Sequence, residues 1–110
     1  MANIDYNKLI QDMSVAVAGK LANNWNEVQP FAEKEVKSFA ETIKLIENLK
    51  EEGKITEEQA KLYIDMSKSS MRTVLLTNEG LGLLATEAAI NAAIDVIRST
   101  VNTAIGLTIL

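Results

Sequence analysis

The chain has 110 residues and a net charge of −4 at neutral pH, and 47% of its residues are apolar. It contains neither cysteine nor histidine, the side chains on which most nucleophilic catalysis, general-base catalysis near neutral pH and zinc binding depend. Its acidic and basic residues are mixed, without the basic block that binds phosphates. We therefore expect no enzyme, no metal or cofactor site and no nucleic-acid-binding protein.

The length suits one domain with a single core, and we expect one all-helical domain over residues 1–110. The apolar residues are mostly aliphatic, with five aromatic residues, five glycines and one proline, a composition that favours helix over sheet. The amino-terminal sequence MANIDYNKLIQD has neither the basic region nor the apolar core of a signal peptide. The cytoplasm is the expected location.

An apolar stripe with the helical period runs through residues 6–49. Its members are three or four positions apart. The stripe comprises Tyr6, Ile10, Met13, Val17, Leu21, Trp25, Val28, Ala32, Val36, Phe39, Ile43, Ile46 and Leu49. Most charged residues of this segment lie off the stripe, which indicates helix with one solvated face.

Pro30 interrupts this segment because proline has no amide proton to donate to the carbonyl of Asn26 and its ring crowds that carbonyl. Two interpretations follow. A single helix bends at Pro30 with the stripe in phase, or one helix ends at Asn23 or Asn24 and Asn26 caps the next. We prefer the bend.

A turn is predicted near Gly53, which can adopt the left-handed conformation that ends helices. Thr56 and Gln59 then form a T-x-x-Q capping box, in which each side chain accepts a hydrogen bond from the other residue's backbone amide. The pattern predicts an antiparallel helical hairpin. In the helix that follows, we expect Met66 and Met71 to fill gaps in the core.

Gly80 weakens the second arm of the hairpin at about the same distance from Gly53 as Pro30 weakens the first. If both arms bend there, a long hairpin results and a four-helix-type bundle forms by dimerisation. If the chain folds back at both points, the same bundle forms within one chain. The sequence leaves both options open because both bury the same stripes.

The carboxy-terminal stretch Leu81–Leu110 is the most apolar part of the chain. Alanines recur in it every four residues, which lets another helix approach closely. The interface candidates on this ridge are Ala85, Ala88, Ala89, Ala92, Ala93 and Val96. A narrow polar stripe comprises Glu87, Asn91, Asp95, Arg98 and Asn102. We interpret it as a solvent-facing edge with Asp95 and Arg98 paired, and the alternative is a polar lining inside an oligomer or pore.

These patterns predict a non-enzymatic helical interaction or assembly protein that associates with itself as a homo-oligomer or binds a helical partner. The alternative is a membrane-active protein that inserts its carboxy-terminal apolar helix. We place this second, because the polar stripe is not basic and neither tryptophan nor tyrosine follows Tyr63.

Overall fold

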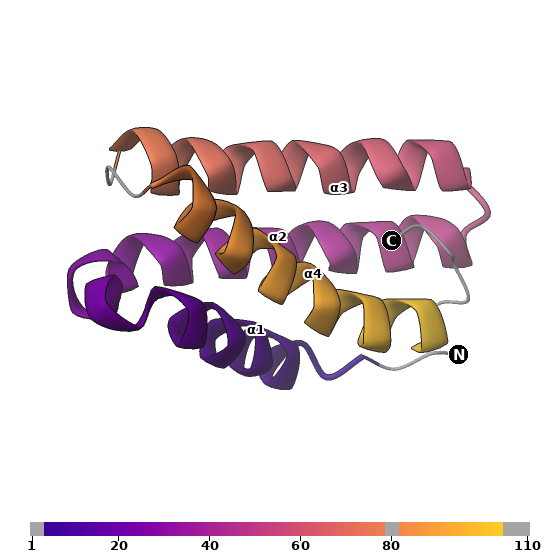
Figure 1. Cartoon of the computed structure of the whole chain (residues 1–110). Coiled ribbons are helices and arrows are strands. Elements are labelled where there is room, and N and C mark those ends of the chain that lie inside the picture. The colour runs from indigo at the N-terminus through magenta and orange to yellow at the C-terminus, as the bar shows by residue number, and fades with distance from the viewer. Residues whose placement is uncertain (1–3, 79–81, 105–110) are drawn as a thin grey trace.

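A computed structural model describes residues 4–78 and 82–104, and within these residues it contains α-helices but no strand. The helices are α1 (Tyr6–Leu21), α2 (Trp25–Glu51), α3 (Glu57–Arg72) and α4 (Leu83–Ala104). Successive helices run in opposite directions (Figure 1). The prediction of an all-α protein is confirmed.

The four helices enclose one apolar core, in an arrangement consistent with a bundle. Every helix contributes side chains to it that are almost completely buried, such as Met13, Phe39, Ile64 and Ile90. The most extensive packing joins α1 to α4, and α2 packs against both α1 and α3. Because one helix of a pair covers the apolar stripe of the other, the chain covers much of its own apolar surface.

The connection between α1 and α2 corrects the interpretation of Pro30. α1 ends at Leu21, and a short 3-10 helix over Ala22–Asn24 leads directly into α2. Pro30 lies inside α2, so the preferred single helix bent at Pro30 is wrong. Asn26 is also inside α2 and does not cap it. Reversal at this point allows α1 and α2 to pack side by side, which buries the same stripe that a bent helix presents.

The turn at Gly53 is confirmed. Gly53 has a φ of 67°, its amide donates to the carbonyl of Lys50, and the amide of Lys54 donates to the carbonyl of Leu49. These two bonds form the Schellman arrangement that ends a helix. Thr56 Oγ1 accepts from the amide of Gln59 at 3.1 Å while the Thr56 amide donates to Gln59 Oε1 at 2.9 Å, so the capping box is confirmed as well.

The end of the third helix is wider than an α-helix, since residues Thr73–Asn78 form a π-helical segment that continues α3. α4 then starts at Leu83 and returns along the bundle (Figure 1). The bend predicted at Gly80 lies outside the described residues.

Candidate interaction surface

The alanine ridge of α4 lies against helices of the same chain. Ala89 and Ala93 have no exposed surface, and Ala92 is buried. Ala85 and Val96 are partly buried against the core, and Ala88 is also partly buried. Since small side chains allow close approach, this ridge explains why α4 packs so extensively on α1.

The polar stripe of α4 lies on its outer side. Asn91, Asp95 and Arg98 are exposed and Glu87 is half-buried, while the side chain of Asn102 lies outside the described residues. Arg98 Nη1 donates to Asp95 Oδ1 at 3.2 Å, which is the predicted i, i+3 pair. The middle of the exposed side of α4 is therefore polar.

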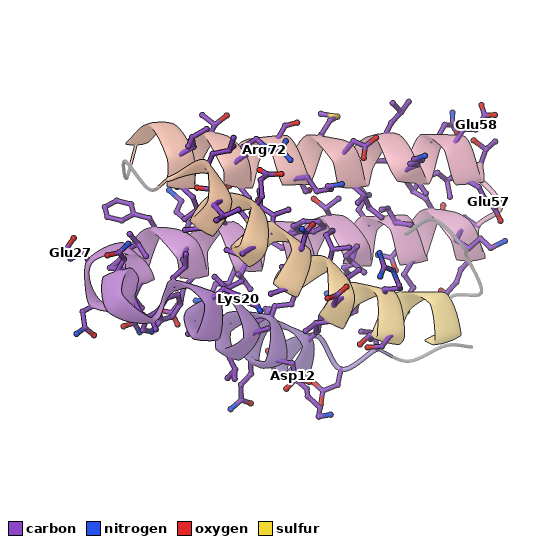
Figure 2. All side chains as sticks on the ribbon, viewed as in Figure 1. Asp12, Lys20, Glu27, Glu57, Glu58 and Arg72 are labelled. Atoms are coloured by element: carbon purple, nitrogen blue, oxygen red, sulfur yellow. The ribbon has the colours of Figure 1, made fainter. Side chains whose placement is uncertain are left out.

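Arg72 and Glu87 join the end of α3 to the start of α4. The guanidinium donates from Nε to Glu87 Oε2 at 2.7 Å and from Nη2 to Oε1 at 3.0 Å. Figure 2 shows Arg72 on α3 (upper helix) near α4. Hydrogen bonding from Arg72 lowers the pKa of the Glu87 carboxyl, and the same bond raises the pKa of Arg72. The fork geometry favours the charged form of both groups.

Tyr6 and Glu47 form a polar pair between α1 and α2. Tyr6 Oη donates to Glu47 Oε1 at 3.0 Å, and the Lys44 ammonium lies 5.9 Å from the centre of the Tyr6 ring. Burial raises the pKa of the Tyr6 hydroxyl, and the hydrogen bond to the Glu47 carboxylate raises it further. The phenol therefore stays protonated and donates the hydrogen bond that joins α1 to α2. It does not act as a base.

Exposed apolar side chains gather on α2 and α3. Among the described residues, the large apolar side chains that are exposed are Val15, Phe31, Leu45, Leu62, Tyr63, Met66, Leu83 and Leu84. Five of these eight belong to α2 or α3. Met66 is 67% exposed, so the expectation that it fills the core is wrong, whereas Met71 is fully buried as expected.

Two exposed stripes define what we call the α2–α3 face. The α2 stripe comprises Phe31, Lys34, Ser38, Glu41 and Leu45, at alternating spacings of three and four residues. The α3 stripe comprises Leu62, Met66, Ser69 and Thr73, at spacings of four, three and four. Such spacing keeps each set on one side of its helix. The α3 stripe carries no charge along its length.

A shallow hollow of about 160 Å³ separates the two stripes and has the ring of Phe39 among its lining residues. Two hydrogen bonds cross between the helices here. Ser70 Oγ donates to Glu35 Oε1 at 2.7 Å, and Ser67 Oγ donates to Thr42 Oγ1 at 3.1 Å. These bonds fix how far α3 is shifted along α2.

Sequence reasoning missed the α2–α3 face, although a signal for it is present. Leu62 and Met66 are four residues apart and lie off the stripe that contains Ala60, Ile64 and Met71. Two apolar residues at that spacing on the otherwise polar side of a helix form a second, smaller apolar face. Six of the sixteen residues of α3 are charged, and they concealed this face in the overall polar composition.

No group of three acidic side chains in the described residues could hold a metal ion. None of the helices, as far as the structure describes them, combines the length and the apolar character needed to cross a bilayer. Comparison of the chain with protein-family models, with curated proteins and with solved structures finds no match. Functional inference therefore rests on the surface itself.

Proposed function

We propose that this chain is a non-enzymatic helical interaction protein, and that the α2–α3 face is the surface through which it associates with itself or with a helical partner. The observation that carries the proposal is the concentration of exposed apolar side chains on this face. Exposed apolar side chains gathered on one face of a small helical domain are typical of a contact site.

Leu62 and Met66 show why the folded monomer does not account for this surface. They are 63% and 67% exposed, so each keeps more than half of its side chain in water. Full burial of such a side chain contributes about 1.5–3 kcal/mol. Most of that free energy is gained only when another surface covers them.

The α4 ridge, where the sequence suggested an interface, is a weaker candidate. Ala89 and Ala93 are covered within the chain, and the middle of the outer side of α4 presents Asn91, Asp95 and Arg98 to solvent. A partner at that outer side would have to desolvate the charged pair, which costs free energy. Insertion of α4 into a membrane would first have to remove Ile90 and Ile97 from the core.

Site-specific photo-crosslinking in the cells that make the protein tests this proposal. The photoreactive residue p-benzoylphenylalanine is placed at Met66 in one variant and at Asn91 in the other, since both positions are exposed and helical. We expect a discrete crosslinked species from position 66 and none from position 91. Crosslinking from position 91 alone would contradict the proposal, because the contact surface would then lie on α4.

A further inference from the structure

We propose that the occupant of the α2–α3 face is a second copy of this chain, packed antiparallel about a two-fold axis perpendicular to the helices. The inference rests on the proposed function, because it takes the α2–α3 face as the contact surface. It adds the identity of the partner and the alignment of the two copies. The two stripes, their common axis and the size of the face carry it.

Read in reverse, the α2 stripe keeps its apolar ends and its central serine and exchanges its basic and acidic residues. From Phe31 to Leu45 the order is apolar, basic, serine, acidic and apolar. In a two-fold interface residue i of one copy meets residue j of the other, and j meets i. With Ser38 on the axis, Phe31 meets Leu45 of the second copy, and Lys34 meets Glu41 twice. The stripe is therefore complementary to itself in both charge and apolar character.

The α3 stripe is self-complementary in size. Its two large side chains, Leu62 and Met66, precede its two small ones, Ser69 and Thr73. A two-fold axis midway between residues 67 and 68 places Leu62 opposite Thr73 and Met66 opposite Ser69. Large residues then face small ones at every step, as close packing between helices requires. In the same alignment Asp65 meets Ser70 rather than another carboxylate.

One axis serves both stripes. The bonds from Ser70 to Glu35 and from Ser67 to Thr42 place the middle of residues 35–42 level with the middle of residues 67–70. Ser38 is thus level with residues 68 and 69 of α3. This differs from the centre of the α3 stripe by about one residue, or roughly 1.5–2 Å along the helix. The two stripes therefore share one two-fold axis to within about one residue.

The size of the face matches a dimer interface. The molecule measures 42 × 23 × 18 Å, so a face that runs along its length offers an area comparable to the roughly 800 Å² that each partner of a stable complex buries. A second copy provides a flat two-helix face of the same length.

Charge reversal tests the proposed alignment by analytical ultracentrifugation. We expect a dimer for the unmodified chain, and a dissociation constant at least about five-fold higher for Lys34→Glu and for Glu41→Lys, because each change creates two like-charge contacts. The double variant should return to within about two-fold of the unmodified chain. An equimolar mixture of the two single variants should form heterodimers, since both charged contacts between them are then attractive.

Rescue in the double variant cannot arise within one chain. Lys34 and Glu41 are seven residues apart on α2, which separates them by about 10 Å along the helix. A general effect of net charge is excluded by the two single variants themselves, because they change the net charge in opposite directions while both are expected to weaken the dimer.

A disulfide provides an independent test at the axis. The chain has no cysteine, so Ser38→Cys introduces a single thiol where the two copies meet. We expect a covalent dimer on mild oxidation, because the two Cα atoms come within the 4.4–6.8 Å that a disulfide spans. Ser99→Cys, on the exposed side of α4, is the matched control and should remain largely monomeric on a non-reducing gel.

The outcomes separate this inference from the proposed function. A monomer at all concentrations overturns the two-fold alignment, and so does a dimer that charge reversal leaves unchanged and that the Ser38→Cys variant does not crosslink on oxidation. If position 66 still crosslinks to a different protein while position 91 does not, the proposed function stands and only the identity of the partner was wrong. A dimer that crosslinks through position 91 alone overturns both.

Discussion

The exposed sides of α3 and α4 have the opposite polarity from what the overall composition of each helix suggests. α4 belongs to the most apolar stretch of the chain, yet its exposed side carries Asn91, Asp95 and Arg98. α3 is rich in charge, yet it exposes Leu62 and Met66. The apolar content of a helix indicates how much surface it has to cover. It does not tell whether the same chain or another molecule covers that surface.

Truncation of one apolar side chain on each helix should produce the largest difference. Ile90 has no exposed surface, so Ile90→Ala leaves a cavity in the core and should lower the free energy of unfolding by about 2–5 kcal/mol. Leu62→Ala should lower the stability of the monomer by less than about 1 kcal/mol. Urea unfolding under conditions that keep the chain monomeric measures both values. Equal losses would mean that Leu62 is a core residue.

Enlargement of the α4 ridge should have the next largest effect. Ala89→Leu or Ala93→Leu overpacks a site that has no free surface and should cost about 1–3 kcal/mol. Asn91→Leu, on the exposed side of the same helix, should change stability by no more than about 0.5 kcal/mol. Leucine and alanine differ little in helix propensity, so the cost of the two ridge variants reports the overpacking itself. Damage from Asn91→Leu as large as from the ridge variants would show that the polar stripe is covered.

Substitution by valine should affect stability differently at two threonines. Thr56 caps α3, and Thr56→Val removes the hydroxyl that accepts from Gln59, at a cost of about 1 kcal/mol. Thr86 in α4 is fully buried, and its hydroxyl has no hydrogen-bond partner in the described part of the chain. Thr86→Val should therefore be neutral or stabilising. Thermal unfolding of both variants distinguishes the two roles, and a large loss at Thr86 would reveal a hidden partner.

The smallest expected effect concerns the link between the two helices. Because Arg72 lowers the pKa of Glu87 in the folded chain, the pair stabilises the fold above the ordinary carboxyl pKa of 4.5, and this contribution is lost as the pH falls through the lowered value. Both side chains are partly exposed, so Glu87→Gln should cost only a few tenths of a kcal/mol at neutral pH. The cost should diminish as the pH falls below 4.5 and through the lowered pKa of Glu87. Urea midpoints across this range test it, and a cost that persists in acid would exclude the ion pair as its cause.

The features predicted correctly depend on residues close together in the sequence. The Gly53 turn and the Thr56 capping box close hydrogen bonds between residues at most five positions apart. The Asp95–Arg98 pair spans three positions. In each case the interaction is complete within one or two helical turns, so residue type and spacing are sufficient to predict it.

The reversal between α1 and α2 was the less-preferred of two interpretations, for the complementary reason. A bend at Pro30 and a break over residues 22–24 present the same apolar stripe, so periodicity does not distinguish them. The choice depends on whether Leu9, Met13 and Val17 are covered by helices of the same chain. That covering comes from α2 and α4, whose residues are distant in the sequence.

The sequence alone determined that this protein is helical, where its clearest turn lies and which residues share a helical side, since these properties follow from propensity, capping and period. Only the tertiary structure decided that α4 turns its alanine ridge inward and that Leu62 and Met66 remain outside. The physical reason is that a side chain is buried only when a second surface covers it. A helix presents an apolar side through its own sequence, but the position of its neighbours decides whether that side becomes core or contact surface.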